Sequence, residues 1–207
     1  MTHTLHRAGN KESLKDDFVV FAIAAQTVNA KGMAPKFGEF FDIVKKYNPN
    51  NFGDMKTGNS FKPGLQTIED GWKDNSIVHA VFNDEETVTK VLKELKEKDT
   101  GLSIVVSGII HEIDECCQKN DLTMHTVENS LGVWGNTDRL PNKDVLEVAT
   151  MCGHGMISFN LIKKLAEDVQ KGKTTSTEAA KKIATQCFCG IVNVPRTARL
   201  IQAMAEK

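Results

Sequence analysis

Three cysteines and one histidine stand in two short, glycine-containing segments of the C-terminal third of the chain. The first segment contains Cys152 and His154, and the second contains Cys187 and Cys189. Thiolate sulfur and imidazole nitrogen are the ligands that zinc and other soft metals prefer. If the two segments meet in the fold, these four side chains can hold a metal.

Two kinds of metal centre fit these donors. With His154 as fourth ligand the set is Cys3His, a tetrahedral zinc set. Without His154, the three thiolates can hold a [4Fe–4S] cluster with one iron open to substrate, and His154 becomes a proton donor. Cys-x-His and Cys-x-Cys are uncommon spacings for structural zinc, and the neighbouring glycines let backbone N–H groups approach cluster sulfurs. We therefore expect a [4Fe–4S] cluster in preference to Zn.

Two further interpretations stay open. Zinc could only staple the helical part of a non-catalytic protein, in which case the site does no chemistry. Free cysteines are also often plain buried side chains.

An apolar helical pattern follows the first cysteine segment, from Ile157 to Val169, and ends at Gly172. Cys152 and His154 are therefore expected just before or at the amino end of this helix. Unpaired N–H groups and the helix dipole there favour a thiolate and lower its pKa.

The second cysteine segment follows another predicted helix, whose start is marked by the capping-box pair Thr175 and Glu178. We expect this helix to end near Gln186, just before the Cys-x-Cys turn. Two helices joined by a short link bring their far ends together, so the sequence predicts that the two cysteine segments converge.

The run Met151–Gly155, with Ile157 two positions on, resembles the MCGHGTI segment of proline racemases. The resemblance implies that Cys152 exchanges a proton at the substrate's α-carbon, with Gly153 and His154 binding the substrate carboxylate or assisting. It covers this segment alone. The second cysteine of that family lies in a DRSPCGTG-like segment, which this chain lacks, and those enzymes are much longer. A metal-free, cysteine-dependent proton-transfer enzyme is therefore an alternative.

Three basic residues are candidates for binding a small anionic substrate. Arg196 and Arg199 lie where Pro195 marks the start of a last helix, and a helix N-terminus with arginines suits a carboxylate or phosphate. Lys56 lies in the Asn- and Gly-rich segment 48–74, which could present backbone N–H groups to an anion. Ordinary salt bridges and a plain surface loop are the alternatives.

The N-terminal part of the chain alternates strand and helix patterns. Apolar runs predict strands at 17–26, 76–82 and 102–110, and a helical stripe with a capping signal predicts a helix over 83–98. Strand, helix, strand at this spacing indicates a βαβ unit or half of a ferredoxin-like split βαβ. A last strand is expected within 122–134.

These patterns predict an α/β (α+β) fold in three parts. Residues 1–16 form a polar tail, 17–134 an α/β domain, and 135–207 a helical, cysteine-rich part packed on it.

The remaining cysteines are expected on a short helix over residues 111–119. Cys116 and Cys117 are adjacent and point about 100° apart on a helix, so at most one faces the core. His111 and Glu115, one turn apart, are expected to form a local pair rather than a metal site.

Composition limits the possible partners. The formal net charge of −1 over 207 residues argues against nucleic acid or an anionic membrane as the main partner. The longest apolar run, Phe18 to Ala25, is too short to span a bilayer, and no signal-peptide pattern begins the chain. We expect a cytoplasmic protein with reduced thiols, and the sequence is compatible with an oligomer as well as a monomer. Its predicted function is an iron–sulfur lyase or oxidoreductase acting on a small anionic metabolite.

Overall fold

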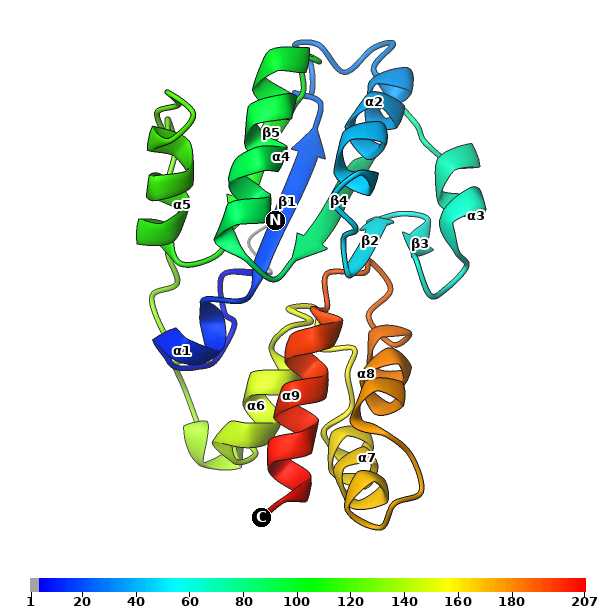
Figure 1. Ribbon diagram of the computed structural model, residues 1–207, viewed down its shortest axis with the longest axis vertical. Coiled ribbons are helices and arrows are strands. Elements are labelled where there is room, and N and C mark those ends of the chain that lie inside the picture. The colour runs from blue at the N-terminus through cyan, green and yellow to red at the C-terminus, as the bar shows by residue number, and fades with distance from the viewer. Residues whose placement is uncertain (1–3) are drawn as a thin grey trace.

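The structure is a computed structural model that describes residues 4–207, so His3 and the first residues of the predicted tail lie outside it. The fold is mixed α+β. Figure 1 shows a sheet with helices over one of its faces in the upper half of the molecule and a group of helices in the lower half. The strands lie in the N-terminal half of the chain, and the lower helices are C-terminal, as the sequence predicts.

The sheet is antiparallel, with the strand order β3-β2-β4-β1-β5. Its strands are β1 (Phe18–Ile23), β2 (Asn51–Asp54), β3 (Gly58–Asn59), β4 (Ile77–Phe82) and β5 (Ser103–Ser107). β4 and β5 flank β1 and are both antiparallel to it, so they are parallel to each other. Helix α4 (Glu85–Lys98) joins them, which confirms the predicted split βαβ unit.

The two faces of β1 belong to two different cores, because successive side chains of a strand point to opposite faces. Phe18 and Val20 pack with α4 and α2 (Ala34–Lys45). Val19 and Phe21 belong instead to the core of the C-terminal helices. The strand therefore joins the two halves of the molecule through one continuous element.

Four helices form the C-terminal part: α6 (Lys143–Ala149), α7 (Phe159–Gln170), α8 (Ser176–Ala184) and α9 (Val194–Ala205). Helix α9 packs against α6, α7 and α8. The predicted capping box of α8 is present, with Thr175 and Glu178 each bonded to the other's backbone. None of the helices in residues 4–207 has the length and apolar character needed to cross a bilayer.

Several boundaries differ from those predicted. Residues 122–134 contain no strand and run as an exposed irregular segment. The segment 48–74 is more regular than expected and contains β2, β3 and helix α3 (Leu65–Asp70). Its hydrophobic residues are too few and too scattered to signal short strands from the sequence.

The N-terminal residues and the first cysteine segment also differ from their predictions. Residues 4–16 are not a solvated tail, since they include helix α1 (Lys11–Leu14) and hydrogen-bond to the helical part. Helix α7 begins at Phe159, so the prediction that Cys152 lies at its amino end is wrong. Cys152 instead follows the end of α6. The short predicted helix over 111–119 is present as α5 (Ile110–Gln118).

Candidate metal centre

Two loops carry the four predicted donors, and the structure brings them together. The first cysteine loop (residues 150–158) joins α6 to α7, and the second cysteine loop (residues 185–193) joins α8 to α9. The sulfurs of Cys187 and Cys189 are 3.8 Å apart. The Cys189 sulfur lies 3.8 Å from Nδ1 of His154, and the Cys152 thiol is close enough to that of Cys187 to interact with it electrostatically.

These contacts connect the donors in a row, from Cys152 through Cys187 and Cys189 to His154. A tetrahedral site needs all four around one point. Accordingly, no group of three or more His, Cys, Asp or Glu side chains among residues 4–207 is placed so that it could hold a metal ion as it stands. The spacing between Cys187 and Cys189 is nevertheless that of two ligands of one ion. Two sulfurs each about 2.3 Å from one zinc ion, at the tetrahedral angle, lie about 3.8 Å apart.

Backbone N–H groups surround the three sulfurs. The amides of His154 and Met156 hydrogen-bond to the Cys152 sulfur. The amide of Ile191 hydrogen-bonds to the sulfurs of both Cys187 and Cys189. Such bonds favour the thiolate form over the thiol, because they add positive potential at the sulfur.

The three thiols differ in the direction in which their pKa values are shifted. The contact with Cys187, followed by burial, raises the pKa of Cys152 far above its ordinary value. For Cys187 the largest influence, the contact with Cys152, lowers the pKa, but the contact with Cys189 and burial outweigh it and raise the pKa to about 11. The hydrogen bond from Cys187 lowers the pKa of Cys189. Cys189 is therefore the first of the three to become a thiolate, whereas the sequence analysis expected Cys152.

The β2–β3 hairpin holds the second cysteine loop from behind. The side-chain amide of Asn59 donates to the carbonyl oxygens of Cys187 (2.8 Å) and Phe188 (3.2 Å). A Cβ added at Gly53 would lie 2.4 Å from the Cys189 carbonyl oxygen, so the backbones approach closely there. Gly190 has φ +82°, and its added Cβ would lie 2.4 Å from Cβ of Asn59. The hairpin and the loop therefore fit only because both glycines lack side chains.

The site is buried at its sulfurs and open at its histidine. Cys152, Cys187 and Cys189 are 1%, 0% and 2% exposed. His154 is exposed and lies between Gly153 and Gly155, the latter with φ +68°. A solute can thus reach the row of donors from the His154 end.

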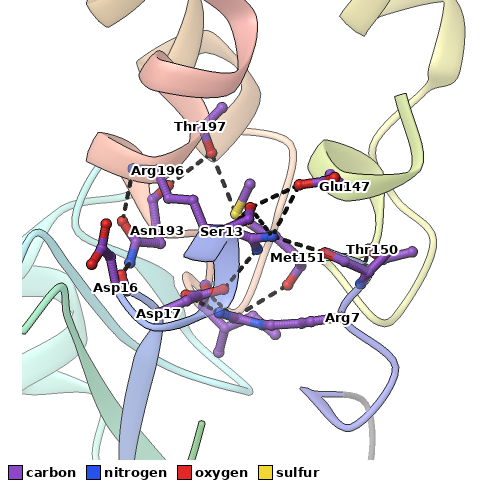
Figure 2. Close-up of polar contacts among 12 residues, drawn as sticks. Arg7, Ser13, Asp16, Asp17, Glu147, Thr150, Met151, Asn193, Arg196 and Thr197 are labelled. Carbon is purple, nitrogen blue, oxygen red and sulfur yellow. Dashed lines mark hydrogen bonds and ion pairs between the residues drawn. The ribbon is translucent and has the colours of Figure 1, made fainter. Parts of the chain in front are cut away.

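The predicted anion-binding residues do not gather at this site. Arg196 is buried and ion-paired with Asp17 at 2.8 Å (Figure 2). Arg199 pairs with Asp16 on the surface. Lys56 is exposed in the β2–β3 turn, and its backbone N–H donates to Asp54. Both arginines are occupied by carboxylates of the protein itself, which removes the support for a substrate role.

Arg7 and Asp17 form a buried cluster with Arg196 that sequence reasoning missed. The carboxylate of Asp17 accepts from both guanidinium groups. Figure 2 shows the three side chains beside Met151, next to the first cysteine loop. No pattern in the sequence signals this cluster, because Arg7 lies in a polar stretch and Asp17 simply precedes an apolar run.

The other candidate groups lie elsewhere. Cys116 is buried on α5, and Cys117 is partly buried. His111 Nε2 lies 3.1 Å from a carboxylate oxygen of Glu115 in an exposed local pair, as expected. A cavity of about 880 Å³ between β5, α4 and residues 122–130 is lined by none of the four donors.

The chain was also compared with known protein families, curated proteins and solved structures. No protein-family model, curated protein or solved structure matches the chain.

Proposed function

We propose that Cys152, His154, Cys187 and Cys189 bind one soft divalent metal ion as a Cys3His set. The observation that carries this proposal is the meeting of four such donors from two loops, with the Cys189 sulfur 3.8 Å from both the Cys187 sulfur and Nδ1 of His154. To surround an ion, the row must close by a movement of its ends. His154 is suited to that movement because it is exposed and flanked by glycines.

The spacing favours a single ion, with zinc as the first choice, over the [4Fe–4S] cluster preferred from the sequence. Each cysteine of such a cluster binds a different iron. Its ligand sulfurs therefore lie much farther apart than two ligands of one ion. The 3.8 Å between Cys187 and Cys189 fits one ion without rearrangement of that loop.

The backbone amides and the position of His154 suggest what the site does. The N–H groups of residues 154, 156 and 191 favour the thiolate form, which a metal ligand must adopt, although the pKa values of Cys152 and Cys187 stay raised in the metal-free protein. His154, at the open end, is the one ligand that an incoming substrate could displace. A bound zinc ion in such a site acts as a Lewis acid or lowers the pKa of water. An enzyme of this kind, in a reducing cytoplasm, is our proposal; its substrate needs no anionic group, since Arg196 and Arg199 are paired within the protein.

A second candidate is metal-free thiol chemistry, because the pKa of Cys189 is lowered. Its thiolate would lie beside His154 and act as a base or nucleophile. The resemblance of the first loop to proline racemases points the same way but to a different residue, Cys152.

Metal and acid-labile sulfide content after anaerobic purification separates these possibilities. About one zinc per chain and no sulfide, with zinc lost in Cys187→Ser, supports the Cys3His proposal. Iron and sulfide in equal amounts would restore the cluster. Protein without metal that also fails to take up added Zn²⁺ or Co²⁺ contradicts both and leaves thiol chemistry at Cys189. Cys116→Ser is the matched control, since it removes a buried cysteine outside the two loops.

A further inference from the structure

We propose that Arg7 is a positioning residue for the candidate metal centre: its guanidinium ties the two cysteine loops together from behind. This inference rests on the proposed function above. It assigns to the N-terminal segment, expected from the sequence to be a tail, the task of holding ligands from two loops at one place.

The contacts of Arg7 reach both loops at once. Its Nη2 donates to the carbonyl oxygen of Met151 at 3.4 Å and also to the carbonyl oxygen of Ile191. Met151 directly precedes Cys152 in the first cysteine loop. One nitrogen therefore bridges the backbones of the two loops.

Ile191 links Arg7 to the sulfurs. Its carbonyl oxygen accepts from Arg7, and its amide hydrogen-bonds to the sulfurs of Cys187 and Cys189. A displacement of this residue toward or away from Arg7 thus moves the donor that the two sulfurs share. A single residue, Ile191, therefore connects the Arg7 guanidinium to the two sulfurs.

Neighbouring contacts fix the segment that carries Arg7. The backbone N–H of Ala8 donates to the hydroxyl of Thr150 at 2.8 Å. The carbonyl oxygen of Ala8 accepts from Arg196 at 2.8 Å. Figure 2 shows Arg7, Thr150 and Arg196 close together. The residue after Arg7 is therefore held by both its N–H and its carbonyl oxygen.

Burial makes the arrangement selective for arginine. The side chains of Arg7 and Asp17 are 6% and 0% exposed, so neither charge can turn to solvent. Arg7 must serve the Asp17 carboxylate through Nη1 and two carbonyls through Nη2. A guanidinium has a planar fork of donors for this, whereas a lysine ammonium is a single point charge.

The test compares Arg7→Met and Arg7→Lys with Arg199→Met in the full-length chain. Arg199 also ties the N-terminal segment to α9, through Asp16, but touches neither cysteine loop. Co²⁺ affinity and the thiolate-to-cobalt absorption band are measured after removal of native metal. We expect both Arg7 variants to bind Co²⁺ about 10- to 100-fold more weakly, as when other supports of ligands are removed. The band should also change in position or intensity, which a loss of global stability alone does not cause.

A second readout does not depend on metal. In a Cys189→Ser background, mild diamide oxidation should join Cys152 to Cys187, and mass spectrometry distinguishes this link from any at Cys116 and Cys117. We expect the link to form more slowly when Arg7→Lys is added, because the two loops lose the contact that holds them together, and at an unchanged rate with Arg199→Met.

The two readouts separate the inference from the proposed function. If the wild type binds no Co²⁺ but the link forms fast and depends on Arg7, the metal proposal fails and the positioning role stands. If Arg7→Lys matches Arg199→Met in the rate of the link, and in Co²⁺ binding where the wild type binds, the positioning role is overturned. Arg7→Lys keeps the positive charge beside Asp17, so it serves as the folded variant if Arg7→Met does not fold.

Discussion

The protein has two groups of free cysteines, one on helix α5 and one in the two cysteine loops, and their surroundings differ. Cys116 and Cys117 are neighbours in the sequence on helix α5, whereas Cys152 and Cys187 are far apart in the sequence and still influence each other's pKa. The Cys116 thiol contacts a backbone carbonyl, that of Glu85, at 3.7 Å. Side chains at adjacent positions of a helix point in different directions, so Cys116 and Cys117 do not face one common point although they are consecutive. Loops have no such constraint and can aim several side chains at one point.

The surrounding groups extend this difference. Burial raises the pKa of both Cys116 and Cys117, which keeps them as thiols. In the cysteine loops, the hydrogen bond from Cys187, together with backbone amides, outweighs burial and lowers the pKa of Cys189. A set of buried cysteines becomes a candidate site only where the chain supplies donors to stabilise the thiolate.

The largest expected contrast between the two groups is in metal binding. Cys187→Ser should abolish stoichiometric binding of Zn²⁺ or Co²⁺, because it removes the donor in the middle of the row. Cys116→Ser should leave binding unchanged. Equilibrium dialysis followed by metal analysis measures both. Equal binding by the two variants would break the distinction drawn here.

The next contrast tests the ionic cluster behind the loops. Asp17→Asn leaves two buried guanidinium groups without their shared carboxylate, and removal of one partner from a buried pair costs about 3–5 kcal/mol of stability. Asp16→Asn breaks a pair whose arginine, Arg199, is 49% exposed and should cost at most about 1 kcal/mol. Denaturant unfolding of the metal-free variants gives the two values. A small loss with Asp17→Asn would show that the cluster does not hold the loops.

Two glycines with similar backbone angles separate loop packing from backbone strain. Gly190 (φ +82°) abuts the hairpin residue Asn59, whereas Gly172 (φ +67°) has no atom within 4 Å of an added Cβ. Alanine at Gly172 should cost about 1–2 kcal/mol, for the left-handed conformation alone. Alanine at Gly190 should cost a further 1–3 kcal/mol or so, for the overlap. Thermal unfolding of both variants checks the order, and equal losses would mean that the hairpin yields without cost.

The smallest contrast concerns pH. In metal-free protein, alkylation of Cys189 should begin at lower pH than that of Cys116, since the pKa of Cys189 is lowered and that of Cys116 is raised. Cys187, with a pKa raised from 9.0 to about 11, should react only at higher pH. Because this folded pKa is raised, the stability that Cys187 contributes is present below about pH 9 and is lost as pH rises through 11. Mass spectrometry of samples labelled across the pH range gives the order, and earlier labelling of Cys116 would contradict it.

Much of the scaffold was predictable, because it depends on local periodicity. The helical stripe predicted over 83–98 marked α4, and its apolar side chains Val88, Val91, Leu92 and Leu95 are buried. Apolar runs marked β1, β4 and β5, and the capping box marked the start of α8. Short strands such as β3, with two residues, carry no periodic signal and were missed.

The sequence by itself determined which residue types could act as ligands, the two segments that hold them and the helices that bring those segments together. Only the tertiary structure decided the order of the donors, the preference for a thiolate at Cys189 and the use of Arg196 within the protein. The physical reason is that periodicity reports which face of an element is buried, while proton sharing and ion pairing depend on distances between distant parts of the chain. Arg7 shows this most clearly. Nothing near it in the sequence indicates that its guanidinium lies between the carbonyl groups of Met151 and Ile191.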